Sequence, residues 1–295
     1  MPAFTWSYPA ARAFELCRRK RYWRNYADSS ERDQARILGR LISSQQLAEQ
    51  SVVAAGTWLR EQDRDTLTGQ EAYEQAARPL LNDVWKSSRT KAWKQPSAIG
   101  TLGILEEVHA ELHPDFDPNW PVTLKTQILE QIEQLSAQMQ PLFAGVPRSA
   151  DCVLGEKQQF EIDQVKMQVD PHWVYRENER IRIHRWECGL PDPADQYHMG
   201  LLVKWATATY GVSPEEVDVI FEYLALGQSV TESDSTALLR AAEDWMKESW
   251  MDMSDYLENE DRLENRPRPK LEWDMTPDRD VCRNCCYHAL CKPEW

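Results

Sequence analysis

The chain has 295 residues, of which 42% are hydrophobic and 28% are charged, so it is long enough to bury a sizeable core. No run of about eighteen apolar residues occurs and no apolar segment follows the first residues, so we expect neither a membrane span nor a secretory leader, and predict a cytoplasmic protein. The net charge of −14 argues against a free-standing nucleic-acid binder, because such proteins usually need a basic surface to neutralise phosphate.

The first half of the chain is predicted to be mostly helical. Apolar residues recur at helical spacing between prolines, which delimits five segments: 10–26, 33–62, 70–93, 101–112 and 123–139. His109 and His113 are one helical turn apart, but no zinc-protease motif accompanies them, so we predict that both are surface residues.

The pattern changes near residue 147. Short runs over 159–169, 173–176 and 180–186 predict strands of an antiparallel meander, followed by a helix over 195–210, a strand over 217–224 and a long helix over 233–258. The last helix carries Trp245, Met246, Trp250 and Met253 on one side, where core packing is favoured over a partner-facing stripe. Its acidic far end, residues 252–264, is the best candidate for meeting a basic partner protein.

Four of the seven cysteines have the spacing of a metal centre. Cys17 stands alone near the start, and Cys282, Cys285 and Cys291 form a C-x2-C-x5-C run. Four thiolates suit a 4Fe-4S cluster, and the same ligands would satisfy tetrahedral zinc, so both metals remain open. Either one would tie the first predicted helix to the last loop.

Three cysteines are left over. Cys286 adjoins Cys285 and could compete with it as a ligand, whereas Cys152 and Cys188 are predicted to be buried free thiols. In a chain without a predicted leader, this many cysteines favour a reducing compartment and a metal rather than disulfides.

The order of elements and the cysteine set resemble the iron–sulfur branch of the RecB-like PD-(D/E)XK nucleases. This group includes the CRISPR-associated iron–sulfur exonucleases and the nuclease domain of AddB-type subunits. The resemblance is carried by segments 8–22, 37–43, 171–177 and 185–189, by Gln196, and by Thr276-Pro-Asp278 ahead of Cys282.

The resemblance implies a single α/β domain over 1–295 with a restriction-endonuclease-like core. Within it, residues 1–146 would be the mostly helical part that carries Cys17, 147–265 the nuclease-like core, and 266–295 the metal-cluster loop. Members of this group hydrolyse phosphodiesters with divalent cations held by carboxylates, beside a catalytic lysine.

The sequence departs from that pattern at the catalytic positions. Ser43 stands where the family has a metal-binding histidine, and His172 replaces the aspartate of the first catalytic strand. On the next strand Arg185 replaces the second acid and Glu187 replaces the lysine. Gln196 is retained, but Gly200 stands where a tyrosine is expected.

These departures predict that the chemistry has been lost. The fixed charge of Arg185 would repel Mg²⁺, and a pair between Arg185 and Glu187 would neutralise the site internally. We therefore expect a catalytically degenerate homologue that is a structural or DNA-positioning subunit of a DNA-processing or defence complex. The alternative is an active DNA exonuclease with a relocated site, in which Asp170, Glu187 and one neighbour bind Mg²⁺ or Mn²⁺.

A basic cluster surrounds the first metal-site cysteine. Arg18, Arg19, Lys20, Arg21 and Arg24 are the best candidates for contacting nucleic-acid phosphate. The competing interpretation is a solvated helix face beside the metal site, and the sequence does not choose between the two.

Overall fold

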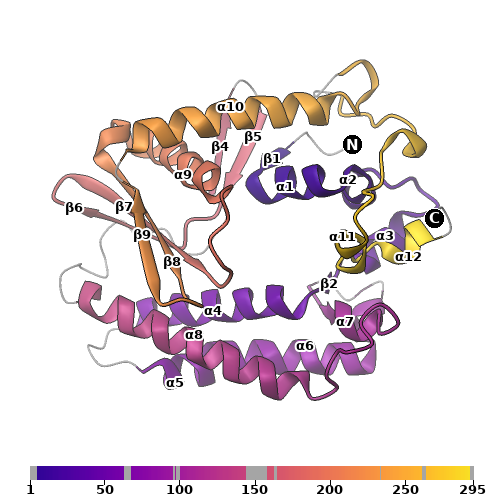
Figure 1. Ribbon diagram of the computed structural model, residues 1–295, viewed down its shortest axis with the longest axis horizontal. Coiled ribbons are helices and arrows are strands. Elements are labelled where there is room, and N and C mark those ends of the chain that lie inside the picture. The colour runs from indigo at the N-terminus through magenta and orange to yellow at the C-terminus, as the bar shows by residue number, and fades with distance from the viewer. Residues whose placement is uncertain are drawn as a thin grey trace.

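The computed structural model describes residues 5–62, 68–95, 97, 100–143, 158–162, 165–232, 234–260 and 264–292. The fold is mixed α/β, as predicted. The helices between residues 44 and 143 lie on one side of the molecule and the long helix 235–254 on the other, while the helices of residues 8–25 lie between them beside 235–254, and the largest sheet stands at one end (Figure 1). None of the helices in the described ranges is long and apolar enough to cross a membrane.

The N-terminal half is mostly helical, with short strands between the helices. Its elements are β1 (Thr5–Ser7), α1 (Tyr8–Leu16), α2 (Arg18–Asn25), α3 (Arg32–Leu38), β2 (Leu41–Ile42), α4 (Ser44–Glu61), α5 (Gly69–Ala72), the π-helix η1 (Tyr73–Ala77), α6 (Arg78–Thr90), the short helix η2 (Ala92–Lys94), β3 (Gly103–Ile104), α7 (Leu105–Val108) and α8 (Trp120–Phe143).

Two of the predicted helices are interrupted. The helix expected over 10–26 breaks at Cys17, whose backbone is extended, and the amide of Arg19 there donates to the carbonyl of Asp274 at 3.0 Å. The helix expected over 33–62 breaks before α4, where the hydroxyl of Ser43 accepts from the amide of Gln46 and the Gln46 side chain accepts from the amide of Ser43. This capping box starts a new helix.

The helix expected over 101–112 was wrong over most of its length, because β3 pairs with β2 and only α7 is helical. The prediction that His109 and His113 lie on the surface was also wrong, since their exposed fractions are 4% and 8%. His113 Nε2 lies 3.1 Å from the carbonyl oxygen of Arg283. These histidines therefore pack against the C-terminal loop, a contact that no local pattern encodes.

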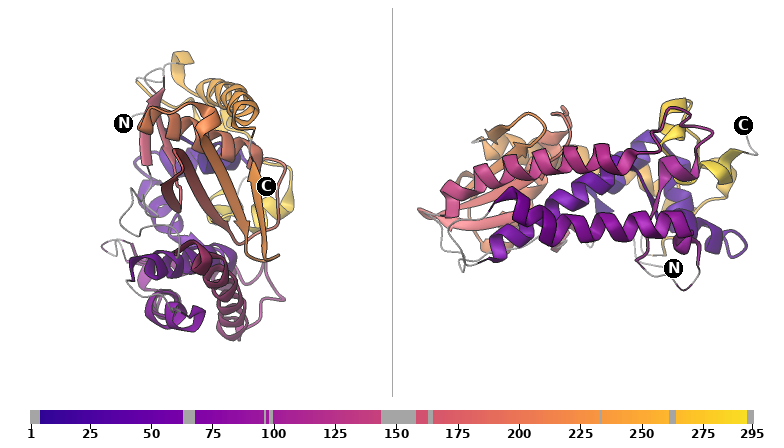
Figure 2. Two further views of the ribbon diagram at one scale, coloured as in Figure 1. Left: turned by 90° about the vertical axis from the view of Figure 1, so that its left-hand side faces the viewer. Right: turned by 90° about the horizontal axis from the view of Figure 1, so that it is seen from below.

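The second half contains two sheets. One has the order β1-β5-β4, and the other, seen face-on in Figure 2, has the order β6-β7-β8-β9. Their strands are β4 (Gln158–Ile162), β5 (Val165–Val169), β6 (Trp173–Glu177), β7 (Arg180–Glu187), β8 (Val217–Tyr223) and β9 (Gln228–Glu232). The run predicted over 159–169 is thus a hairpin, and β1 and β9 were not predicted.

Helix α9 (Asp195–Tyr210) connects β7 to β8, which pair in parallel. It ends at Gly211, as predicted, in a left-handed conformation that glycine adopts without strain. Gly200 faces α10 (Ser235–Ser254), and an added Cβ would lie only 2.2 Å from the carbonyl oxygen of Leu238. No tyrosine fits at this position, because the two helices approach each other too closely.

The sheet β6–β9 separates two apolar clusters. Ile183 and Phe221 belong to the cluster that includes α9 and α10, whereas Trp173 and Trp186 belong to the cluster that includes α4 and α8. Alternating side chains of each strand point to opposite faces, so both faces of the sheet are covered. Among the α10 residues, Met246, Trp250 and Met253 are buried, which confirms core packing for that stripe.

The C-terminal segment returns to the first helices. It contains the short helices η4 (Glu258–Glu260), η5 (Lys270–Glu272), α11 (Arg279–Arg283) and α12 (His288–Cys291). Figure 1 shows α11 and α12 beside α2 and α3. The side chain of Asp278 caps α11 by accepting from the amides of Asp280 and Val281.

Candidate functional site

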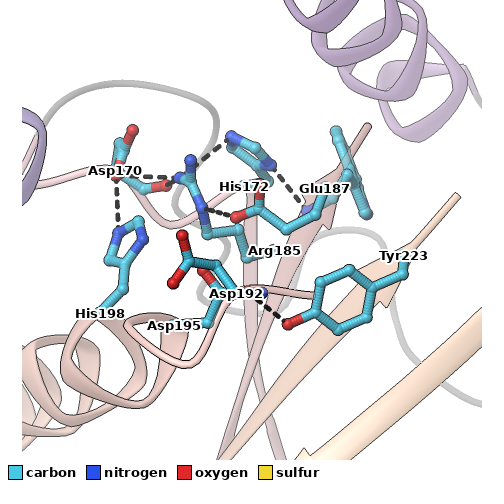
Figure 3. A network of polar contacts seen from close by, with 9 residues as sticks. Asp170, His172, Arg185, Glu187, Asp192, Asp195, His198 and Tyr223 are labelled. Atoms are coloured by element: carbon cyan, nitrogen blue, oxygen red, sulfur yellow. Dashed lines mark hydrogen bonds and ion pairs between the residues drawn. The ribbon is translucent and has the colours of Figure 1, made fainter. Parts of the chain in front are cut away.

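Arg185 occupies the centre of the predicted catalytic position (Figure 3). Its Nη1 lies 2.9 Å from Asp170 Oδ1, and its Nε lies 2.5 Å from Glu187 Oε1. Nη1 also donates to the backbone carbonyl of Asp170 at 2.8 Å. The side chain is only 14% exposed, so one buried guanidinium bridges two carboxylates, as the predicted pair with Glu187 requires.

Asp170 has a second hydrogen-bonding neighbour. His198, on α9, places Nε2 3.2 Å from Asp170 Oδ1, and its ring stacks on Tyr8 with centroids 4.4 Å apart. Burial, the largest single influence, would raise the pKa of Asp170, but the charge of Arg185 and the hydrogen bond from His198 together outweigh it, so this pKa lies well below its usual range. Asp170 is therefore ionised at neutral pH and neutralises the charge of Arg185.

His172 serves the backbone rather than a metal. Its Nδ1 accepts from the amide of Trp186 at 2.9 Å, and its Nε2 lies 3.5 Å from Nη1 of Arg185. Burial, reinforced by the adjacent guanidinium, lowers the pKa of His172 well below its usual value, so the imidazole is neutral. This geometry holds β6 and β7 in register.

Two further positions of the family pattern, the altered Ser43 and the retained Gln196, lie outside this network. Ser43 is the N-cap of α4, and Gln196 is exposed on the first turn of α9. The neighbouring acid Asp195 instead accepts from the hydroxyl of Tyr223 at 2.7 Å and from the amide of Asp192 at 2.9 Å. Asp163, a further acid near the catalytic strands, lies outside the described residues.

Glu49 is a functional candidate that the sequence did not indicate. It lies on α4, and burial and the negative charge of Glu187 raise its pKa, against the opposing influence of Arg185. Burial and the charges of Glu49 and Glu187 likewise raise the pKa of the buried thiol Cys188 to about 12. Glu49 thus adds a third carboxylate near Glu187, whereas Arg185 forms its ion pairs with Asp170 and Glu187.

Four cysteines from the two ends of the chain line one small cavity, namely Cys17, Cys282, Cys285 and Cys291. The indole Nε1 of Trp23 donates to Cys291 Sγ at 3.2 Å. Within the part of the chain that the structure describes, no group of three or more His, Cys, Asp or Glu side chains is gathered so that it could hold a metal ion. The four thiols therefore share a cavity without converging on one point.

The chemistry of these donors suits a soft metal centre. Burial raises the pKa of Cys282 and of Cys291 to about 11, helped by neighbouring cysteines, so either would bind a metal at neutral pH only by releasing its proton. Cys285 lines the cavity, whereas Cys286 lines the adjacent cleft. This placement favours Cys285 over Cys286 as a ligand. Cys152 lies outside the described residues, and Cys188 is buried as predicted.

The basic cluster divides into buried and exposed members. Arg19 and Arg21 are 3% and 5% exposed, and Arg19 donates to the carbonyl of Trp273 at 2.7 Å. The guanidinium of Arg18 lies over the ring of Phe14 at 5.5 Å. The prediction that all five cations contact phosphate therefore fails for Arg19 and Arg21, which are buried and interact with Trp273 and Tyr26.

Lys20 and Arg24 face a large cleft of about 1350 Å³ between α2, α3 and the start of α4. Arg32 and Arg36 line the same cleft, so four cations share it with two carboxylates, Glu49 and Glu106. Glu106 is engaged, because it accepts from the amide and hydroxyl of Ser44. The cleft is locally positive in an acidic protein, and through Glu49 it borders the Arg185 network.

The acidic side chains of the stretch 252–264 are exposed where the structure describes them, whereas Met253 and Leu257 within it are buried. Asp252, Asp255, Glu258 and Glu260 are exposed, and residues 261–263 lie outside the described ranges. Glu264 pairs with Arg266 at 3.4 Å.

No protein-family profile and no curated protein matches this sequence. Among solved structures, the chain has a weak likeness to one described as "Crystal structure of SSO0001". Their sequence identity is 12%, the match covers 73% of this chain and 85% of that chain, and the TM-score is 0.25. A TM-score this low carries no argument about the fold or the function of this chain.

Proposed function

We propose that this chain is a catalytically degenerate homologue of the iron–sulfur PD-(D/E)XK nucleases that serves as a structural or DNA-positioning subunit of a DNA-processing or defence complex. The observation that carries the proposal is the buried Arg185 between Asp170 and Glu187. A permanent cation there takes up the carboxylate charge that a catalytic divalent ion would need, and repels the ion at short range.

The topology supports a restriction-endonuclease-like core. Strands β6 and β7 are antiparallel, α9 follows, and β8 returns parallel to β7. In this arrangement the ends of β5 and β7 bring Asp170, Arg185 and Glu187 together, beside the first turn of α9. These are the elements on which the resemblance places the catalytic groups.

The four cavity cysteines are the proposed ligands of a structural 4Fe-4S cluster, with zinc as the alternative. In a cluster each thiolate binds one of several iron atoms, so the four sulfurs surround a core that is larger than a single ion. A single zinc ion needs all four sulfurs at about 2.3 Å from one point. The shared cavity brings thiols from both ends of the chain together, which either metal would require. The bound metal would fasten Cys17 to the C-terminal loop.

The cleft beside α2 is the proposed DNA-positioning surface. Lys20, Arg24, Arg32 and Arg36 supply positive charge there, and phosphate contacts of this kind position nucleic acid without reading its sequence. Because the cleft borders the blocked catalytic position, DNA bound in it would be held and not cut.

A nuclease assay tests this proposal. Labelled single- and double-stranded DNA is incubated with the full chain over a titration of Mg²⁺ and of Mn²⁺, with Glu187→Ala as a matched variant. We expect no cleavage by either protein, together with DNA binding that weakens as salt rises. Cleavage by the parent chain that Glu187→Ala abolishes would overturn the proposal, and binding that does not depend on salt would overturn its DNA-positioning part.

The rival function is a metal-dependent exonuclease with a relocated site. Glu49 favours it, because this residue adds a third carboxylate beside Glu187 and its raised pKa marks a crowded negative site. Such an enzyme would require Arg185 to leave the carboxylates when the metal binds. The same assay with Glu49→Gln separates the two functions, since only the rival predicts an activity that this variant loses.

A further inference from the structure

A groove of about 490 Å³ lies on the helical half, between η1, α6 and the start of α8. It lies on the helices opposite α10 (Figure 1) and takes no part in the Arg185 network, the cysteine cavity or the cleft. Its volume is within the range of about 300–1,000 Å³ that is usual for ligand pockets.

The lining of the groove is mainly apolar and aromatic. Leu81 and Trp85 of α6 face Pro121 and Val122 at the start of α8. Val122 is 68% exposed, although apolar side chains of this kind are usually covered. The floor therefore offers an apolar surface large enough for an anchoring side chain.

The charges that line the groove have one sign. Among its described lining residues, the charged side chains are Arg78 and Lys125. Arg78 pairs with Glu74 on its own helix face, and the ammonium of Lys125 lies over the Tyr73 ring at 5.8 Å from the centroid. Arg78 is therefore already matched by Glu74, and Lys125, for which the described residues show no ion pair, is the cation of the lining that would attract an anion.

Trp120 forms the buried inner wall of the groove. It lines the groove and is 4% exposed, yet its indole N–H has no hydrogen-bond partner among the described residues. The rings of Trp85 and Phe116 enclose it at centroid distances of 5.2 and 6.2 Å. The ring is therefore held by aromatic packing and supplies apolar surface to the groove.

The backbone beside the groove is also unusual. Tyr73 begins the π-helix η1, which runs to Ala77 between α5 and α6. π-Helical turns are rare and occur frequently at functional sites. Here the wider turn presents Tyr73 to the groove, opposite Lys125 of α8.

We propose that this groove docks a short segment of a partner protein in which an apolar anchor residue is flanked by carboxylates. The anchor would cover Trp85 and Val122, and the carboxylates would meet Lys125. Nucleic acid fits less well, because two cations beside an apolar floor make a poor phosphate track. This docking site is separate from the proposed DNA-positioning cleft and does not depend on it.

A peptide selection on the full chain tests the proposal. A displayed library of random twelve-residue peptides is selected for binding, with counter-selection against Val122→Glu, which places a carboxylate in the groove. We expect the enriched peptides to share Leu, Phe or Trp flanked by Asp or Glu. No enrichment over the counter-selected variant, or enrichment of Lys- and Arg-rich peptides, would overturn the proposal.

Matched variants then locate the bound peptide by fluorescence anisotropy. We expect Val122→Glu and Lys125→Glu each to weaken binding about tenfold or more, and Thr123→Glu and Lys86→Glu to leave it within about twofold. The two control residues are exposed on the same helices but do not line the groove. Equal losses in test and control variants would refute the location, and so would competition by a single-stranded oligonucleotide. Circular dichroism confirms that each variant is folded.

Discussion

Replacing Arg185 by methionine is the sharpest test of the central site. The change keeps most of the apolar stem but removes the guanidinium that bridges Asp170 and Glu187. Breaking a buried pair by removing one partner costs about 3–5 kcal/mol. The two carboxylates are 29% and 21% exposed, so water can reach them and the lower end, about 3 kcal/mol, is expected.

The loss is measured as the fall in melting temperature. For domains of this order of size, 1 kcal/mol corresponds to about 2–4 °C, so Arg185→Met should melt about 6–12 °C below the parent. Arg182→Met is the matched control on the same strand. Of its two partners, Asp218 keeps Arg180 and Glu177 is 40% exposed, so this control should lose about 1 kcal/mol or less.

Divalent cations provide the decisive second measurement. In Arg185→Met, the carboxylates of Asp170 and Glu187 lose their shared cation, and Mn²⁺ should take its place and recover part of the lost stability. A ligand present at a hundred times its dissociation constant contributes about 2.7 kcal/mol. The parent and the Arg182→Met control should not respond. Equal losses in the two variants, or no response of Arg185→Met to Mn²⁺, would refute the view that Arg185 replaces a metal.

Three further predictions concern other parts of the molecule. Cys17→Ser should lower the iron content of protein reconstituted without oxygen, and metal analysis that finds one zinc and no iron would reject the cluster. Glu49→Gln should raise the melting temperature at pH 7 but not at pH 4. A carboxyl whose pKa is raised in the folded state lowers the free energy of unfolding only when the pH rises above the pKa of the unfolded chain, about 4.3. An equal gain at both pH values would contradict this sign. Lys20→Ala with Arg24→Ala should weaken DNA binding at least tenfold and reduce its salt dependence, while the distant Lys86→Ala should change neither.

The predicted elements that were correct depend on local signals. The helix over 195–210 and its stop at Gly211 follow from helical spacing and from the conformational freedom of glycine. The strands at 173–176 and 180–186 follow from alternation on either side of a turn at Asn178. The break of the first helix at Cys17 has no such signal, since it depends on a backbone bond to Asp274.

In the candidate site, too, some features follow from the sequence and others only from contacts between distant residues. Residue types alone indicated that Arg185 and Glu187 would pair, because two opposite charges on one strand face are two residues apart. The residue types could not show that Glu49 lies near Glu187. They also could not show that Arg19 and Arg21 are buried, because long charged side chains on a short helix are usually predicted to be exposed to solvent.

The sequence by itself determined the acidic composition, the cysteine spacing and the chemical character of the altered catalytic positions, because these are properties of residue types and of their separation along the chain. Only the tertiary structure decided which side chains meet. It placed Cys17 in one cavity with the C-terminal cysteines and set Asp170 against Arg185, since such contacts come from helix and strand packing between residues far apart in the chain.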